Sequence, residues 1–406
     1  MSELLQKTAG KREEVCIMPE YDLWKYCTSE QVKITLHSFD LLAGVPMDEE
    51  KELACLYAVS NHTEKHYQQV QIPKRKGGMR CLSVPDGLLC TIQKNILRHV
   101  LCEFSASEYA TAYKKKTSVL DNASPHVGAE QIVKLDIKDF FENISFLLVY
   151  QYAFPAVHFP PAIRRMLTEL CCYRDCLPQG APTSPAVSNL VMKPFDEYMG
   201  EWCKERGIAY TRYCDDLTFS YKKGSEMENS AGKPWKENME EDFSEGVEES
   251  GNSLNHINAK ALIGKVRGFL HVYGFELNNK KTRVFKRNVR QSVTGIVVNE
   301  KPQVSREYRR NLRQEIYYCR KFGVESHLKR KYAGNGSHVD SRDKRNGNTE
   351  NIHNNACASG KQVGISCQRY LQKLLGKISY VCLVNPGDKE FQEARTEVMR
   401  WMRMVN

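Results

Sequence analysis

The sequence predicts an α+β fold, in which the strands of an antiparallel sheet are packed with helices. The apolar, β-branched run IVKLDI at 132–137 is typical of a buried strand. Two further strand candidates, at 208–211 and 217–220, flank a tight polar turn, which is the pattern of a hairpin. Apolar residues at helical spacing over 187–195 and 265–273 supply helices to cover such a sheet.

Further elements are predicted on both sides of this central region. Residues 1–65 have a mixed, helical pattern and carry no chemical motif. A second hairpin is expected around the basic turn KRKGG, because short extended segments precede and follow it. The strands of this hairpin, a helix and two late strands are expected at 67–73, 79–84, 92–104, 284–286 and 293–298.

Helices are expected to fill the C-terminal part of the chain. Residues 305–321 have the pattern of a helix with Ser305 as its N-cap. Leu312, Ile316 and Cys319 make its apolar face, while arginines and tyrosines crowd the rest. A second apolar helix is expected at 370–384. The basic helix suits contact with the phosphates of a nucleic-acid duplex, although a solvated basic helix has the same pattern.

Two segments are expected to be insertions without a packed core. Residues 223–258 are rich in Glu, Ser, Asn and Gly, and residues 332–364 in Asn, Gly and Ser. Neither holds enough large apolar side chains to offset the entropy cost of ordering it. Because both interrupt otherwise regular stretches, they are predicted to be loops or disordered segments rather than linkers between domains.

Charge and composition favour a polyanionic partner. The chain has 406 residues, two or three times a typical domain, with a net charge of +10 and 41% hydrophobic residues. Residues 223–258 carry a net charge of −6, so the rest of the chain carries +16. Charge alone does not separate nucleic acid from an acidic membrane surface. No apolar run reaches the ~18–20 residues that span a bilayer, so no membrane partner is expected.

The fifteen cysteines are expected to be reduced thiols. Their number is odd, they are scattered, and the N-terminus lacks the apolar core of a signal peptide. The densest group, Cys171, Cys172 and Cys176, lacks a fourth ligand at zinc-site spacing and is expected in a half-buried helix or turn. These features predict a soluble, cytoplasmic protein.

Two groups of carboxylates stand at the ends of apolar strands. Asp136 lies near the end of the run at 132–137, and Asp215 and Asp216 occupy the turn between the paired strand candidates. A carboxylate there is costly unless it is paired or binds a cation. Strands lying side by side would bring these groups together around two magnesium ions, about 3.5–4 Å apart. On its own, the Asp-Asp pair is better explained as an ordinary hairpin turn.

A turn that leads into a helix, PQGAPTSP at 178–185, lies between these carboxylates in the sequence. Its prolines are confined to the start of the helix, where they are tolerated. Its small residues let a base pair or a backbone approach closely. Taken alone, this segment is also the pattern of an ordinary loop and helix start.

Together and in this order, these segments resemble the reverse transcriptase family. LDIKDFF at 135–141 resembles its first acid motif, PQGAPTSP its template-grip motif, and YCDD at 213–216 its second acid motif. NKKT at 279–282 resembles the lysine motif that follows, and the segment at 72–93 resembles the fingers motif. Cys214 stands where the family usually has alanine. The resemblance covers roughly residues 67–300 and continues into the thumb.

Within that family the chain most resembles bacterial retron reverse transcriptases. NASPH at 122–126 matches their NAxxH motif, and Val293, Thr294 and Gly295 match their VTG motif, each in the expected place. The resemblance implies a right-hand polymerase with fingers, a palm built on the antiparallel sheet and a helical thumb. The implied domains are N-terminal helices with fingers, the palm with part of the fingers, and the thumb, at 1–130, 131–302 and 303–406.

The resemblance implies which residues serve DNA synthesis. Asp136 and Asp215 are the implied metal ligands, with help from the backbone carbonyl of Ile137, and Asp216 is expected to orient them. Lys281 is implied to protonate the leaving pyrophosphate, although a surface lysine explains it nearly as well. The implied cofactor is a pair of Mg²⁺ ions, with Mn²⁺ as a substitute.

The incoming nucleotide is expected to meet aromatic, polar and basic side chains. Phe141 stands where the family places its sugar gate, whose ring collides with a ribose 2′-hydroxyl, whereas Phe140 is expected in the core. Gln179 is implied to contact the nucleotide or the template. The alternative for the basic hairpin is a solvated tip. The residues expected to neutralise the triphosphate are Lys74, Lys76 and Arg80.

Nucleic-acid contacts are expected in three places. Asn122 and His126 of the NAxxH motif are assigned to organising RNA or the priming site, with a structural histidine as an equal alternative. Thr294 is expected near a bound RNA stem. The template–primer duplex is expected to lie along the basic helix, through Arg306, Arg309, Arg310 and Arg313.

The retron resemblance also implies the biology. Such enzymes copy part of their own structured noncoding RNA from dNTPs, starting at the 2′-hydroxyl of an internal guanosine, and leave a branched RNA–DNA hybrid. They act with an effector or toxin protein in antiphage defence in bacteria. The alternatives are a group II intron-like or other defence-associated reverse transcriptase, an RNA-dependent RNA polymerase, and a catalytically silent RNA-binding scaffold.

Overall fold

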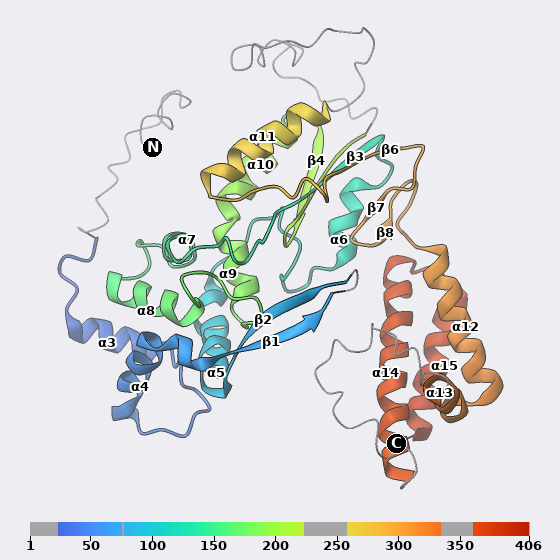
Figure 1. Ribbon diagram of the computed structural model, residues 1–406, viewed down its shortest axis with the longest axis horizontal. Helices are drawn as coiled ribbons and strands as arrows, with labels where there is room; N and C mark the ends of the chain where they lie inside the picture. The colour runs from blue at the N-terminus through green and yellow to red at the C-terminus, as the bar shows by residue number, and fades with distance from the viewer. Residues whose placement is uncertain (1–22, 75–76, 223–257, 334–359, 406) are drawn as a thin grey trace. The chain divides into compact units, whose positions relative to one another are not determined.

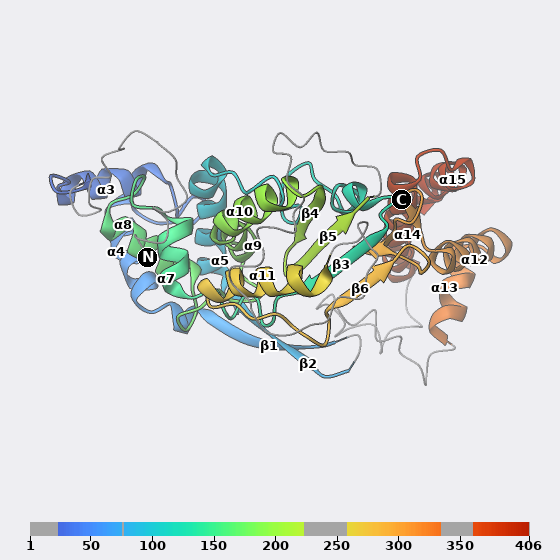
Figure 2. The same ribbon diagram turned by 90° about the horizontal axis from the view of Figure 1, so that it is seen from above.

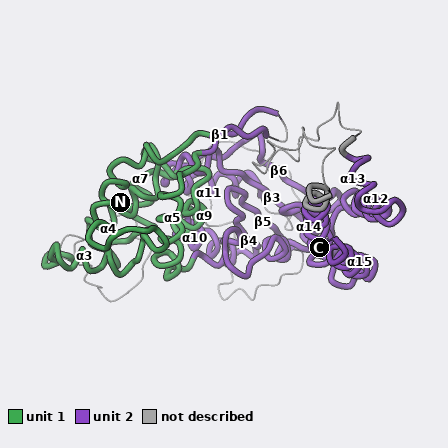
Figure 3. Tube along the Cα trace, turned by 90° about the horizontal axis from the view of Figure 1, so that it is seen from below, with its two compact units in different colours: residues 1–69, 83–105, 144–191 green, residues 70–82, 106–143, 192–406 purple. Residues whose placement is uncertain are grey.

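The structure, a computed structural model, describes residues 23–74, 77–222, 258–333 and 360–405 (Figure 1). The chain divides into two compact units, drawn in green and purple in Figure 3. Helices and antiparallel sheets are both present, which confirms the predicted fold class. Unit 1 consists of residues 1–69, 83–105 and 144–191, and unit 2 of residues 70–82, 106–143 and 192–406.

Unit 1 is mainly helical. Its core contains Leu89 and Ile92 of α5, which are fully buried. The helix predicted at 92–104 begins earlier, because the side chain of Asp86 caps it by accepting from the Leu89 backbone at 2.9 Å. It continues into a π-helical and a 3₁₀ turn instead of remaining α-helical. The α-helices are α3 (Ser29–Ser38), α4 (Glu49–Asn61), α5 (Gly87–Asn95), α7 (Phe146–Leu148), α8 (Pro161–Cys171) and α9 (Ser184–Val191).

Unit 2 is built on a four-stranded antiparallel sheet with the strand order β4-β5-β3-β6. Strand β3 (Gln131–Asp136) lies between β5 (Asp216–Tyr221) and β6 (Arg283–Lys286), and β4 (Ile208–Tyr213) pairs with the far side of β5. Ile132, Val133 and Leu135 are buried, as expected for the central strand of a covered sheet. All four strands were predicted from the sequence, with bounds that differ by one or two residues.

Two helices pack beside this sheet. Helix α10 (Lys193–Lys204) contacts β4, and Figure 2 shows α10 and α11 (Ala259–Val272) along the sheet. The rings of Tyr198 and Phe269 stack at 3.9 Å between the two helices. Helix α11 begins six residues before the predicted start, because the side chain of Asn258 caps it by accepting from the Ala261 backbone.

A two-stranded hairpin is formed by β1 (Tyr67–Pro73) and β2 (Met79–Pro85), as predicted. The backbone N–H of Lys74 donates to the carbonyl of Gly78 at 2.9 Å and closes the turn. Gly77 and Gly78 have φ values of 91° and 82°, which glycine adopts readily.

The C-terminal part of unit 2 is a helical thumb, as predicted. Leu312, Ile316 and Cys319 of α12 join a core with the other thumb helices, which confirms the predicted apolar face. Helices α13 and α15 were not predicted. Short strands β7 (Ser292–Val293), β8 (Ile296–Val297) and β9 (Gln303–Val304) lead into α12 (Arg306–Phe322), α13 (Val324–Ala333), α14 (Gly360–Val384) and α15 (Lys389–Val405).

The two predicted insertions lie largely outside the described residues, which exclude 223–257 and 334–359. The boundaries predicted for the second are wrong, because residues 332–333 end α13 and residues 360–364 begin α14. Within the described ranges, no helix combines the length and the apolar character that crossing a bilayer requires.

Candidate active site

The end of β3 and the turn between β4 and β5 are joined through the backbone. The sheet register places Asp136 opposite Asp216. Immediately beyond, the backbone N–H of Ile137 donates to the carbonyl of Asp215 at 2.9 Å. The carboxylates of Asp136, Asp215 and Asp216 therefore share one end of the sheet, as the sequence predicted.

The turn between β4 and β5, residues 214–215, has an unusual backbone. Cys214 has a φ of 61°, a left-handed conformation that is rare for residues other than glycine. The carbonyl of Cys214 accepts from the guanidinium of Arg212 at 3.1 Å. Its thiol lies 3.3 Å from the hydroxyl of Tyr113, which donates to it. The turn is thus held from two sides.

A buried ion pair fixes the position of Arg212, whose guanidinium binds this turn. Arg212 binds Asp196 of α10 through two guanidinium nitrogens, the closest pair being 2.6 Å apart, and both side chains are 0% exposed. The hydroxyl of Tyr210 also donates to Asp196, at 2.8 Å. This arrangement was not predicted. The sequence does carry a signal for it, because Asp196 and Arg212 are charged residues inside two apolar elements. A charge in such a place requires a buried partner.

Lys281 lies beside Asp136 because the intervening backbone is fixed. The N–H of Asn278 donates to the carbonyl of Asp136 at 2.8 Å, and the N–H of Lys281 donates to that of Asn278 at 3.0 Å. The Lys281 ammonium donates to Oδ2 of Asp136 at 2.7 Å. The other oxygen, Oδ1, is buried and has no hydrogen-bond partner among the described residues.

Burial raises the pKa values of two of these carboxylates, and a neighbouring charge adds to the effect. Burial raises the pKa of Asp136, and the charge of Asp215 adds to this effect while the hydrogen bond from Lys281 opposes it. Burial also raises the pKa of Asp216, again with a contribution from Asp215. Desolvation lowers the pKa of Lys281, but the hydrogen bond and charge of Asp136 outweigh it, so the net shift is upward. A site with such repulsion between carboxylates favours cations.

The donor set fits a divalent cation. Within the described ranges, no three Asp, Glu, His or Cys side chains are gathered closely enough to hold a metal ion as they stand. Magnesium usually takes only one or two protein carboxylates and completes its shell with water and substrate phosphates. The unpartnered Oδ1 of Asp136, beside the Asp215 turn, is such a donor. A role for the Ile137 carbonyl stays a prediction.

Phe141 follows the first acid motif and is half-buried. Its ring lies 5.4 Å from that of Phe140, which in turn lies 5.9 Å from Phe275. Phe140 is 4% exposed, which confirms its predicted place in the core. These ring contacts fix Phe141 near the end of β3. The role of Phe141 as a sugar gate stays a prediction.

The remaining nucleotide-site residues lie on two other segments. In unit 1, the carbonyl of Gln179 accepts from the backbone of Ser83 at 2.9 Å, and Ser184 closes the loop by donating to the carbonyl of Pro178 at 2.6 Å. Gln179 itself is half-exposed. On the β1–β2 hairpin, Lys74 and Arg80 are exposed. The third predicted residue, Lys76, lies outside the described residues.

Comparison with known proteins identifies the family. The profile of the family described as "Reverse transcriptase (RNA-dependent DNA polymerase)" matches residues 72–298, which include every carboxylate described above. The chain belongs to the reverse transcriptase family. It is therefore an RNA-directed DNA polymerase, and the sheet that carries the carboxylates is the palm.

Two of the relatives that the chain matches are named retron reverse transcriptases. The chain is 30% identical to retron Ec86 reverse transcriptase of Escherichia coli over 62% of its own length and 69% of that protein's. It is 30% identical to retron Mx65 reverse transcriptase of Myxococcus xanthus over 65% and 58% of the respective lengths. Among solved structures, Candida albicans telomerase with a telomeric RNA fragment matches with 10% identity, a TM-score of 0.37, and coverage of 88% and 70%. The family match, not this distant likeness, identifies the fold.

The NAxxH motif of this reverse transcriptase is structural, which corrects the predicted RNA contacts. Asn122 is 1% and His126 0% exposed, so neither offers a surface to RNA. His126 bridges the catalytic hairpin, with Nδ1 2.7 Å from the hydroxyl of Ser220 and Nε2 2.8 Å from that of Thr211. Asn122 accepts from the hydroxyl of Thr111 at 2.8 Å. The motif holds β4 and β5 against the preceding segment.

We expect His126 to make the stability of the enzyme depend on pH. Burial lowers the pKa of His126 to about 3, and the charges of Lys222 and Lys134 add to this. The unfolded chain, with an ordinary histidine pKa of about 6.5, then binds the proton more tightly. The stability that neutral His126 contributes is therefore complete above about pH 6.5 and is lost as the pH falls.

The measurement is the free energy of unfolding at pH 7.5 and pH 5.0, for the wild type and His126→Gln. The wild type is expected to lose about 2 kcal/mol more than the variant over this range. Equal losses in the two proteins would show that His126 is protonated in the folded state. His126→Gln also loses hydrogen bonds, but this loss lowers the free energy of unfolding equally at both pH values. It therefore cancels when the change between the two pH values is compared.

Thr294 of the VTG motif also has a structural contact. Its hydroxyl donates to the carbonyl of Val119 at 3.2 Å, and its φ is 47°. The side chain is half-exposed. An RNA contact at Thr294 stays a prediction.

The thumb arginines divide into two sets. Arg309 and Arg313 are committed to ion pairs with acids at the start of α15, Asp388 and Glu390. The Arg313 guanidinium lies 2.7 Å from Glu390. These ion pairs hold α12 against α15, and the contact of Arg309 and Arg313 with a duplex stays a prediction. Arg306 and Arg310 are exposed on α12, and their contact with a duplex stays a prediction.

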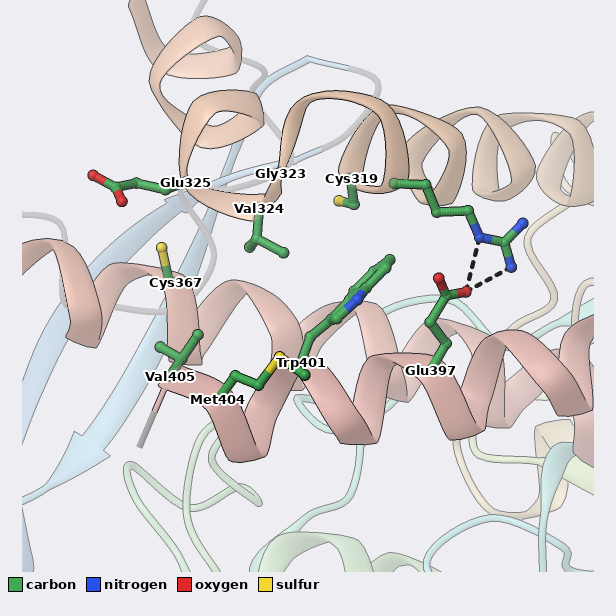
Figure 4. Close-up of a pocket in the computed structure, with 10 residues that line it drawn as sticks. Cys319, Gly323, Val324, Glu325, Cys367, Glu397, Trp401, Met404 and Val405 are labelled. Carbon is green, nitrogen blue, oxygen red and sulfur yellow. Dashed lines mark hydrogen bonds and ion pairs between the residues drawn. The ribbon is translucent and has the colours of Figure 1, made fainter.

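A cavity of about 610 Å³ lies among the helices α12, α13, α14 and α15 (Figure 4). Figure 4 shows Val324, Cys367, Trp401 and Val405 pointing into it. An ion pair between Arg320 and Glu397, 2.6 Å apart, lies at one end. None of the carboxylates at the end of the palm sheet lines this cavity.

Proposed function

We propose that this enzyme is a retron reverse transcriptase that copies part of its own structured noncoding RNA into DNA. In this proposal, synthesis starts at the 2′-hydroxyl of an internal guanosine and leaves a branched RNA–DNA hybrid. The enzyme acts in the bacterial cytoplasm with an effector protein in antiphage defence. Support comes from the retron names of the relatives and from the NAxxH and VTG motifs at their expected positions.

One observation carries the catalytic part of the proposal. The hydrogen bond from the Ile137 backbone to the Asp215 carbonyl brings the acid of β3 to the acids of the β4–β5 turn. Asp136 and Asp215 would hold two Mg²⁺ ions, for which Mn²⁺ substitutes. When bound, such ions supply positive charge for the attacking hydroxyl and the triphosphate. Asp216, paired opposite Asp136 in the sheet, orients these carboxylates.

Lys281 has the properties of a general acid for the leaving pyrophosphate. Its ammonium lies at the carboxylates, 2.7 Å from Asp136. Its side chain is 59% exposed, so it remains open to substrate. An ammonium group at this place would donate its proton to the oxygen of the leaving pyrophosphate as negative charge develops there.

Contacts with the incoming dNTP are assigned to five residues of the sequence motifs. Phe141 would exclude a ribose 2′-hydroxyl by contact with its ring. Gln179 would contact the nucleotide or the template. Lys74, Lys76 and Arg80 of the hairpin would neutralise the triphosphate.

Sequencing the nucleic acid that copurifies with the enzyme tests the retron proposal. The expected species is one structured RNA joined to DNA through a 2′,5′ linkage, which a debranching enzyme releases as two strands. The preparation from Asp215→Asn is expected to contain the same RNA without DNA. A heterogeneous set of linear RNAs, or intron RNA, would instead favour another kind of reverse transcriptase.

We expect Phe141→Ala to admit ribonucleotides. Removing the ring opens the space that a 2′-hydroxyl needs, so the ratio of kcat/KM for dNTP over rNTP should fall about tenfold to a hundredfold. The measurement is single-nucleotide primer extension with each nucleotide type. Phe141→Tyr, which keeps the ring, serves as the control and should retain discrimination. Unchanged discrimination in Phe141→Ala would move the gate to another residue.

A further inference from the structure

Residues 111–117, named here the lysine loop, are attached to the strand and turn that carry the catalytic acids. The backbone N–H of Arg212 donates to the carbonyl of Tyr109 at 2.8 Å, and that of Thr111 donates to the carbonyl of Arg212 at 2.9 Å. Tyr113 then reaches the turn itself, with its hydroxyl 3.3 Å from the Cys214 thiol. The loop is therefore attached both to β4 and to the catalytic turn.

The conformation of the lysine loop is imposed by its surroundings. Tyr113 and Lys116 have φ values of 60° and 64°, which are sparsely populated by such residues. The hydroxyl of Thr117 donates to the carbonyls of Thr111 and Lys114, at 3.0 and 2.9 Å, and draws the ends of the loop together. Backbone conformations of this kind persist where the structure fixes them and cluster at binding sites.

The lysine loop presents a ring and two positive charges to solvent. Tyr113 is 52% exposed, although its hydroxyl is anchored. Lys114 is turned inward and donates to the carbonyl of Ser107 at 3.1 Å. Lys115 and Lys116 are exposed, and their ammonium groups have no ion pair or hydrogen bond within the described ranges. Unpaired cations beside an exposed ring suit the phosphates and sugars of nucleic acid.

We propose that the lysine loop binds the end of the primer strand. Lys115 and Lys116 contact the phosphates nearest the terminal hydroxyl, and the ring of Tyr113 packs against the terminal nucleotide. The inference rests on the proposed catalytic function, because that function requires the terminal hydroxyl to reach Asp136 and Asp215. The primer is the strand whose terminal hydroxyl must lie at the catalytic turn. Its last phosphates therefore lie next to the lysine loop, which is attached to that turn.

Equilibrium binding tests the two lysines. The probe is an RNA template annealed to a fluorescein-labelled DNA primer, measured by anisotropy at several KCl concentrations without dNTPs. Lys115→Gln/Lys116→Gln should weaken binding roughly tenfold and lower the slope of log K against log[salt] by about two. The matched control, Lys65→Gln/Lys94→Gln, removes two exposed lysines of unit 1 and should leave both values unchanged. Equal slopes in the two double variants would overturn the proposal.

Neutral phosphate analogues identify the strand. Replacing the last two primer phosphates with methylphosphonates should weaken binding to the protein that keeps both lysines. The same replacement should not further weaken binding to Lys115→Gln/Lys116→Gln. The same replacement is then made in the template strand. If Lys115→Gln/Lys116→Gln is insensitive to the template replacement and not to the primer replacement, the primer assignment is wrong. All proteins in this series also carry Asp215→Asn. The experiment therefore measures binding alone and does not depend on whether the enzyme extends primers. Failed extension by the wild type would contradict the proposed function and leave this test intact.

Variants of Tyr113 separate the ring from its hydroxyl. Tyr113→Ala should raise the KM for primer–template severalfold, because the terminal nucleotide loses its support. Tyr113→Phe, which keeps the ring and removes the bond to Cys214, should keep a KM near that of the wild type. Equal KM values for wild type and Tyr113→Ala would remove Tyr113 from the binding surface.

Discussion

Asp215→Asn is expected to reduce DNA synthesis about a thousandfold or more. The substitution keeps the shape of the side chain and removes the negative charge that contributes to the raised pKa of Asp136. Loss of cation binding at this point costs several kcal/mol of transition-state stabilisation, and each 1.36 kcal/mol is a factor of ten in rate. The measurement is extension of a DNA primer on an RNA template with dNTPs and Mg²⁺.

Asp40→Asn is a suitable control for this variant. Asp40 is exposed in unit 1 and has a φ of 45°, which asparagine tolerates as well as aspartate. It should extend primers at the wild-type rate. If Asp215→Asn were as active as Asp40→Asn, the chain would be a scaffold that retains the fold, and the polymerase assignment of these carboxylates would fail.

Asp196→Ala is expected to destabilise the palm by about 3–5 kcal/mol. The change leaves the charge of Arg212 unpaired at a position that is 0% exposed. It also frees the guanidinium that holds the carbonyl of Cys214. Urea unfolding measures the loss of stability directly. A loss below about 1 kcal/mol would mean that water reaches Arg212 and that the pair is not the support described here.

The double variant Asp196→Leu/Arg212→Met separates stability from positioning. Replacing a buried ion pair with apolar side chains of similar volume is often neutral for stability, so this variant should be more stable than Asp196→Ala. It should still have a lower kcat than the wild type, because no guanidinium then holds the Cys214 carbonyl in its left-handed turn. Its KM for dNTP should change less than its kcat. A wild-type kcat in the double variant would show that the turn keeps its shape without Arg212.

The sheet could be predicted from local patterns because each strand carries its own signal. The β-branched run at 132–137 and the short apolar segments around the Asp-Asp turn became β3, β4 and β5 with small shifts at their ends. The register that places Asp136 opposite Asp216 is a long-range property. The sequence did not predict this register; it predicted only that the acids meet, from the assumption that acids at strand ends share a cation.

Interactions between distant residues explain what the sequence did not predict. Asn122 and His126 carry a motif, but a motif does not reveal burial, and the hydroxyl partners of His126 lie 94 and 85 residues further along the chain. The arginines of α12 looked free because α15, whose acids pair with Arg309 and Arg313, was not predicted. The lysine loop has no periodic pattern, so its attachment to the turn became visible only in the structure.

Manganese binding tests most directly whether Asp136 and Asp215 act together on a cation. The free Mn²⁺ remaining in a titration of the protein, followed by electron paramagnetic resonance, reports the affinity without any need for catalysis. The wild type is expected to bind Mn²⁺ at least about tenfold more tightly than Asp136→Asn/Asp215→Asn. Superimposable titration curves for the two proteins would contradict a shared cation site at the end of the palm sheet.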